Sequence, residues 1–146
     1  MEFIESVFIE KPKEFVAEMY HKIRYTQEYN QTLIDVKSIE GTIGETNSVS
    51  ELFFSHAPTE GQRERVIERT FPETFIFEME NEIAMTKTSV LFIGLDSRRT
   101  ELKMKTEYAG MGGFLSFGMK GQKKFIRKQI QDSLHRVKAI CEAVYN

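Results

Sequence analysis

Hydrophobic and polar residues alternate along most of the middle of this chain. The clearest case is residues 100–108, TELKMKTEY, where apolar and hydroxyl-bearing side chains share one face and charged side chains occupy the other. A repeat of two is the pattern of a β-strand with one buried face. We expect turns at residues 42–47 and 57–62, which are rich in turn-forming residues, and we expect the VLFI run, 90–93, to be covered on both faces. The same repeat predicts further strands at residues 2–10, 34–41, 48–56, 63–71, 74–81 and 85–95.

Two segments show the spacing of a helix instead. A proline opens the first of these, which suits a first helical turn, and its apolar residues lie three or four positions apart: Phe15, Val16, Met19, Tyr20 and Ile23. The second covers residues 123–146 and has a longer stripe, made of Ile126, Ile130, Leu134, Val137, Cys141 and Val144. Alone in water this stripe would be exposed, so it requires the apolar face of the sheet as its partner. Residues 24–33 fit either a second short helix or a loop.

The order of these elements predicts an α+β fold. One strand is followed by one or two short helices, then by about six consecutive strands and a long helix. A run of strands without crossover helices favours an antiparallel sheet with the helices on one side. The 146 residues fit one domain, residues 1–146.

The composition limits the kinds of partner that the protein can bind. Hydrophobic residues make up 40% of the chain and charged residues 29%, and the net charge is −2. A slightly negative net charge provides no positively charged surface for the backbone of a nucleic acid. No apolar run reaches the roughly 18 residues of a membrane span, so we expect no stable membrane anchoring. The acidic, alternating N-terminus does not resemble a signal peptide, and the single Cys141 fits a reducing compartment, so a cytoplasmic protein is expected.

Three stretches carry a family resemblance. The opening strand runs into EKPKEFVAEMY, and residues 86–108 look like a final hairpin. The stretch GMGGFLSFGMKGQKKFIRKQIQDSLHRVKAI resembles a glycine-bearing entry into the long C-terminal helix. In these features the chain resembles the SRPBCC superfamily, which includes START lipid-transfer domains, birch-pollen-allergen-like proteins and polyketide cyclases. The resemblance covers essentially the whole length and rests on patterns, without an invariant catalytic motif.

The resemblance implies a helix-grip fold, in which a curved antiparallel sheet of about seven strands surrounds the C-terminal helix and encloses an apolar cavity. Members bind lipids, sterols, polyketides or other hydrophobic ligands, and some transform them. Many members carry a tryptophan or another bulky aromatic residue near the end of the short helices. This chain has no tryptophan, and Tyr25 and Tyr29 are the nearest aromatic residues.

The glycine-rich stretch at residues 107–125 does not match a nucleotide-binding loop. The spacing of a P-loop is present, but Met119 occupies the position of the lysine that contacts phosphate. Three interpretations remain open: a loop packed into the core, a mobile segment at a cavity mouth, and a site of transient membrane contact. In the last, Phe114, Leu115 and Phe117 would insert beside Lys120, Lys123 and Lys124.

The candidate ligand-binding residues face inward on the predicted strands or belong to the glycine-rich stretch. Within this set His56, Thr106 and Tyr108 are polar groups that could orient a ligand. The full set is Phe54, His56, Phe75, Phe77, Met79, Leu102, Met104, Thr106, Tyr108, Phe114 and Phe117.

The sequence shows no catalytic motif, and no cofactor is expected. His21 and His135 lie among charged neighbours on predicted helices and are expected to be solvated. His56 has no carboxylate partner nearby in the sequence, and no group of residues has metal-ligand spacing. The charges of residues 63–69 predict a solvated or cross-strand-paired face, and Arg65 and Arg69 would matter only if they pointed inward.

Three hypotheses follow, with the oligomeric state left open. The first is a non-enzymatic module that binds a hydrophobic or amphipathic small molecule between the sheet and the long helix. The second is a cyclase- or hydratase-type enzyme that uses the same cavity. The third is a protein-interaction module with a filled core.

Overall fold

The computed structural model describes residues 2–80, 84–109 and 119–144. Within these ranges the helices are α1 (Lys13–Ile23) and α2 (Met119–Glu142). The strands are β1 (Glu2–Ile9), β2 (Leu33–Glu40), β3 (Val49–Phe54), β4 (Ala57–Thr70), β5 (Thr74–Glu80), β6 (Met85–Gly94) and β7 (Thr100–Ala109).

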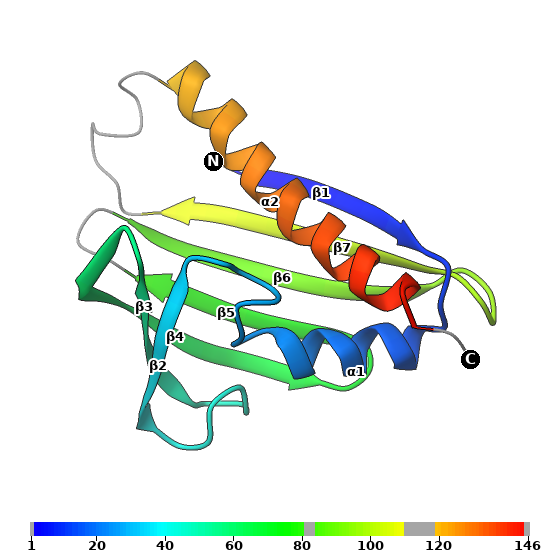
Figure 1. The fold of residues 1–146 in the computed structure, drawn as a ribbon, viewed down its shortest axis with the longest axis horizontal. Coiled ribbons are helices and arrows are strands. Elements are labelled where there is room, and N and C mark those ends of the chain that lie inside the picture. Colours follow the sequence, from blue (N-terminus) through cyan, green and yellow to red (C-terminus); the bar gives the residue numbers. More distant parts are fainter. Residues whose placement is uncertain (1, 81–83, 110–118, 145–146) are drawn as a thin grey trace.

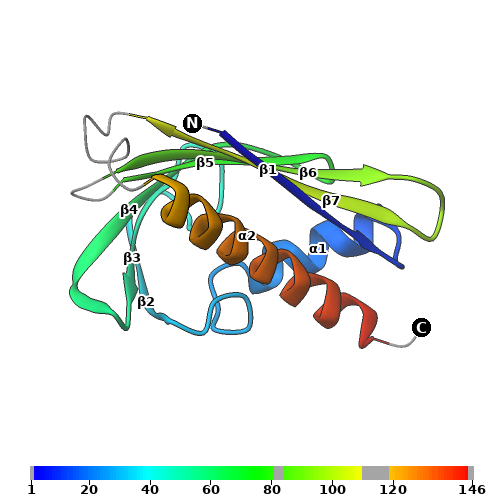
Figure 2. The same ribbon diagram turned by 90° about the horizontal axis from the view of Figure 1, so that it is seen from above.

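The described strands form one antiparallel sheet in the order β1-β7-β6-β5-β4-β3-β2. Neighbouring strands are also consecutive in the chain, with one exception. β1 pairs with β7, in a register that runs from Glu2 opposite Glu107 to Ile9 opposite Thr100. The connection through α1 carries the chain from one edge of the sheet to the other. The sheet curls at the β2–β4 side, and both helices lie on its concave face (Figure 1, Figure 2). The predicted α+β helix-grip architecture is confirmed.

The C-terminal half of α2 is the part packed tightly against the sheet. Leu134, Val137 and Cys141 are buried, whereas Ile126 and Ile130 nearer the start of the helix are only partly covered. Polar contacts fix the same end, because the Lys138 ammonium donates to the Phe8 carbonyl at 2.6 Å and the Glu10 amide donates to Glu142 at 2.9 Å. Among the described helices, neither has the length together with the apolar character needed to cross a membrane.

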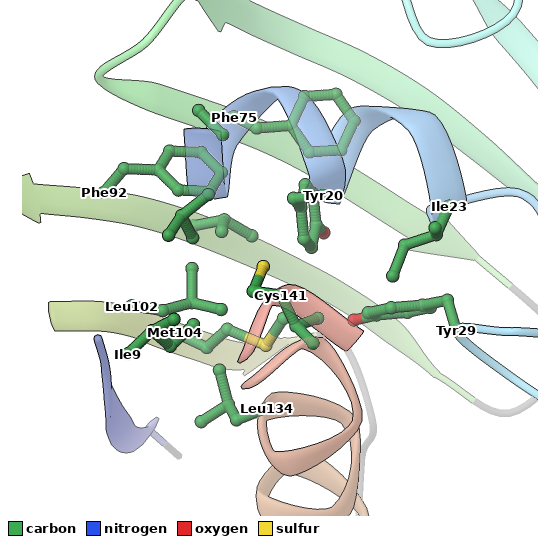
Figure 3. Packing of buried hydrophobic residues seen from close by; sticks show 14 of the residues in the cluster. Ile9, Tyr20, Ile23, Tyr29, Phe75, Phe92, Leu102, Met104, Leu134 and Cys141 are labelled. Carbon is green, nitrogen blue, oxygen red and sulfur yellow. The ribbon is translucent and has the colours of Figure 1, made fainter. Parts of the chain in front are cut away.

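The core sits where α1, the end of α2 and the sheet meet (Figure 3). Tyr20 of α1 is completely buried, and its ring meets those of Phe75 and Phe92 edge to face, with centroids 5.9 and 5.5 Å apart. Cys141 approaches this cluster from α2. Of the rest of the predicted α1 stripe, Val16 and Ile23 are buried, and Phe15 and Met19 are partly buried against the core.

Two local expectations need correction, and one that was open is decided. Residues 57–62 are not a turn: they begin β4, and Phe54 pairs with Ala57 across a two-residue turn. Their polar side chains concealed a strand that is held by backbone pairing to β3. The VLFI run is covered on one face only, because Ile93 remains exposed on the outer face of the sheet. For residues 24–33, where a second short helix and a loop were both open, the structure has turns that lead into β2.

Candidate functional site

A pocket of about 840 Å³ lies between the concave face of the sheet and the first half of α2. Its apolar wall comes mainly from the strands, and polar side chains come from both the sheet and α2. The lining residues are Arg24, Tyr29, Asn30, Gln31, Thr32, Leu33, Leu52, Phe54, His56, Gln62, Phe77, Met79, Thr86, Thr88, Met104, Thr106, Tyr108, Phe125, Ile126, Gln129, Ile130, Asp132, Ser133 and Arg136.

The position of the pocket follows from where α1 ends. Strand register places inward-facing residues in rows across β5, β6 and β7. The row of Phe75, Val90 and Met104 packs into the core, where Phe75 meets Tyr20, and Met104 also reaches the pocket. α1 ends at Ile23, and the next two rows line the pocket: Phe77, Thr88 and Thr106, then Met79, Thr86 and Tyr108.

The structure brings together seven of the eleven candidate ligand-binding residues. Two others, Phe75 and Leu102, are fully buried in the core and do not line the pocket. Residues 110–118 of the glycine-rich stretch, which include Phe114 and Phe117, lie outside the described residues. The seven that line the pocket are Phe54, His56, Phe77, Met79, Met104, Thr106 and Tyr108.

Polar groups lie at two places along the strand side of this pocket. Thr88 and Thr106 are buried and share a hydrogen bond of 3.2 Å between their hydroxyl oxygens. Each hydroxyl retains acceptor capacity for a further partner. His56 stacks on Phe54 at a centroid distance of 5.8 Å at the β3–β4 turn, and Tyr108 lines the wall with its pKa raised by burial.

A buried ion pair adjoins the pocket. The Arg24 guanidinium donates through Nη2 to Glu64 Oε2 at 2.6 Å, and the side chains are 6% and 1% exposed. The Tyr25 hydroxyl donates to the other oxygen of the same carboxylate. Arg24 follows the last turn of α1 and Glu64 comes from β4, so the pair joins the helix end to the sheet.

Aromatic rings enclose this guanidinium. Its carbon lies 4.6 Å from the ring centroid of Phe77, 5.0 Å from that of Tyr25 and 5.3 Å from that of Tyr29. Burial lowers the pKa of Arg24, but Glu64 and the neighbouring Tyr20, Tyr29 and Tyr25 together outweigh it, and the pKa is raised overall. Burial, followed by the charge of Glu64, raises the pKa of Tyr25. Arg24 is therefore a permanent cation in the wall of a largely apolar pocket.

No family model matches the sequence, and no curated protein matches it. Solved structures do match over nearly their whole length. Ara h 8.0201 aligns with a TM-score of 0.78 at 11% identity and covers 99% of both chains. The Zhui aromatase/cyclase from Streptomyces sp. R1128 aligns with a TM-score of 0.74 at 14% identity and covers 97% of this chain and 93% of the other.

Norcoclaurine synthase from Thalictrum flavum, solved with dopamine and hydroxybenzaldehyde, aligns with a TM-score of 0.72 at 11% identity. The alignment covers 100% of this chain and 89% of the synthase. All three are helix-grip members of the SRPBCC superfamily. This chain has the same helix-grip fold. At these identities the likeness establishes the fold and leaves the ligand to be argued from the pocket.

Within this helix-grip fold, the buried ion pair is the feature that sequence reasoning missed. The charges of residues 63–69 were expected on a solvated or cross-strand-paired face, yet Glu64 points inward with Val66. Of the two arginines singled out there, Arg65 is exposed. Arg69 lies opposite the buried Phe75 and therefore on the inner face, where it is partly buried and pairs with Glu45 at 3.3 Å. The available signal was that Glu64 shares its face with Val66, since residues two apart on a strand lie on one face.

Only one of the two helix histidines is exposed, although both were expected to be solvated. His135 is exposed on α2 as predicted, but His21 is partly buried against Tyr20, Phe75 and Phe92. Burial lowers the pKa of His21 to about 4, assisted by the positive charges of Arg69 and Arg24. Its helix position indicated exposure, but Phe71 and Phe75 cover it from a strand and turn distant in sequence.

Elsewhere in the described part of this helix-grip chain, no group of three or more histidine, cysteine or acidic side chains is placed to hold a metal ion. Cys141 is buried in the core, where desolvation raises the pKa of its thiol to about 11. A thiol that stays protonated is a poor nucleophile and a poor metal ligand. Cys141 therefore acts as a small core side chain.

Proposed function

We propose that this protein binds a hydrophobic or amphipathic small molecule in the pocket between the sheet and α2. The observation that carries the proposal is the pocket itself: about 840 Å³ of space beside a well-packed core. Protein interiors are close-packed unless function requires a cavity, and small-molecule sites have volumes of roughly 300–1,000 Å³. The similarity to structures solved as an aromatase/cyclase and as a synthase with bound aromatic molecules supports the same use of the fold.

Binding would rest first on apolar burial. Phe54, Phe77, Met79 and Met104 line the strand side of the pocket, and Ile126 and Ile130 face them from α2. Each Å² of apolar surface removed from water contributes about 25 cal/mol. Methionine side chains adapt to irregular guests because they are unbranched and polarizable.

A cyclase- or hydratase-type enzyme acting in the same pocket is the second candidate. It is favoured by the presence of His56 and Tyr108 in the lining, since both can exchange protons. The buried carboxylate Glu64 does not support it, because Arg24 and Tyr25 already occupy its oxygens. A filled-core interaction module is disfavoured by the volume of the pocket.

Native mass spectrometry after incubation with mixed lipids tests the proposal. We expect retained small molecules on the wild-type chain and on Glu80→Trp, whose side chain is exposed next to Met79 in the same strand. Met79→Trp should lose most of the retained species, because the indole occupies the pocket. An empty wild-type protein, or equal retention by both variants, would contradict binding at this site. A change in the mass of the released molecule would instead favour the enzyme.

A further inference from the structure

The Arg24–Glu64 pair is more than apolar binding requires. Both side chains are buried, at 5% and 1% residue exposure, and burying two charges is costly even when they pair. Apolar residues of similar volume would connect the end of α1 to β4 at lower cost. The pair therefore indicates a role in the pocket beside it.

The guanidinium of Arg24 has N–H donors that are not used by Glu64. It carries five N–H donors, and Nη2 donates to Glu64. Its buried Nε meets no acceptor in the part of the chain that the structure describes. An unsatisfied buried donor is unfavourable, and more so when it is charged. Arg24 belongs to the pocket wall together with Tyr29 and Phe77, and its side chain is 6% exposed. A guest in the pocket can therefore accept a hydrogen bond at the exposed edge of the guanidinium, while Nε itself stays covered.

Charge balance then selects the kind of acceptor. Glu64 already cancels the charge of Arg24, and the Tyr25 hydroxyl holds the second carboxylate oxygen. On α2, Asp132 and Arg136 line the pocket with opposite charges four residues apart. An anionic guest would add an uncompensated charge beside Glu64 in a desolvated site. An uncharged oxygen would accept from Arg24 without that penalty.

We propose that Arg24 is the specificity-determining residue of the pocket and donates a hydrogen bond to an uncharged oxygen, carbonyl or hydroxyl, on an otherwise apolar guest. Glu64 sets this preference by cancelling the charge of the guanidinium, with Tyr25 holding the carboxylate in place. The inference rests on the proposed function, because it names the class of molecule that the pocket accepts.

Displacement of N-phenyl-1-naphthylamine, an uncharged fluorescent probe, tests the proposed function and the role of Arg24 separately. The competitors share one alkyl chain: methyl dodecanoate, dodecan-1-ol and dodecanoate, the last fully ionised at about pH 8. The wild-type protein should bind the ester and the alcohol about tenfold or more tightly than the carboxylate. No binding of the probe or of any competitor would refute the proposed function itself. Probe binding with equal or tighter binding of dodecanoate would overturn only the role of Arg24.

Variants test the residue directly. Arg24→Met should weaken the ester and the alcohol about tenfold while the probe changes less than threefold, and the exposed Arg65→Met should change neither. Glu64→Gln should shift the preference toward dodecanoate about tenfold, because the guanidinium loses its counter-charge. If thermal unfolding shows that a single variant is not folded, Arg24→Met with Glu64→Met removes both charges. Wild-type affinity for the ester and the alcohol in Arg24→Met or in the double variant would overturn the inference.

Discussion

At the scale of single residues, burial gives ordinary side chains unusual properties. Arg24 is a cation surrounded by three aromatic rings, and Glu64 is a carboxylate with both oxygens engaged. His21 is covered by aromatic residues of the core, with a buried Nε2 that has no partner among the described residues. These groups link the stability of the fold to charge and to pH.

His21 should make stability depend on pH between about 6.5 and 4. Its pKa is lowered to about 4 in the folded chain from an ordinary 6.5, so in this interval the unfolded chain binds the proton and the folded chain does not. Stability is therefore full above pH 6.5 and falls as the pH drops toward 4. With allowance for partial exposure, the loss is about 2 kcal/mol.

Urea unfolding at several pH values measures how much of the pH dependence of stability comes from His21. His21→Phe should lose less stability than the wild type between pH 6.5 and 4, because its buried ring cannot take up a proton. The exposed His135→Gln is the matched control and should follow the wild-type curve. A His21→Phe protein that loses as much stability as the wild type over this interval would show that His21 is not responsible.

At the scale of elements, α2 has two halves with different roles. The half from Leu134 to Cys141 is part of the core, whereas the half from Phe125 to Ser133 supplies one wall of the pocket. α1 fills the other end of the concave face and stops at Ile23. The pocket occupies the space that neither helix fills.

Leu134→Ala should therefore destabilise the protein strongly. Its side chain is buried against the core, and removing it leaves a cavity, which costs about 3 kcal/mol. Lys124→Ala, at an exposed position on the same helix, should cost less than about 0.5 kcal/mol. Chemical denaturation of both variants provides the measurement. A loss below about 1 kcal/mol for Leu134→Ala would mean that α2 does not pack on the sheet as described.

At the scale of the whole molecule, the alternation and the helical stripe were sufficient to predict an α+β fold with an antiparallel sheet, and the family resemblance added the helix-grip arrangement. The sequence could not separate pocket from core: Phe75 and Phe77 have the same pattern, and only the end point of α1 distinguishes them. It could not reveal the Arg24–Glu64 pair either, because these residues are 40 positions apart and meet through the fold. Residues 57–62 were missed because backbone pairing, rather than side-chain pattern, makes them a strand.

The central claim is that the space between the sheet and α2 receives an apolar guest. The methyl groups of methionine report on it directly, since Met79 and Met104 line the pocket, whereas Met19 packs in the core and Met85 is exposed. Carbon-13 methyl NMR during addition of N-phenyl-1-naphthylamine should shift the Met79 and Met104 signals and leave those of Met19 and Met85 in place. Saturating probe that moves only Met85, or moves none of the four, would contradict the account.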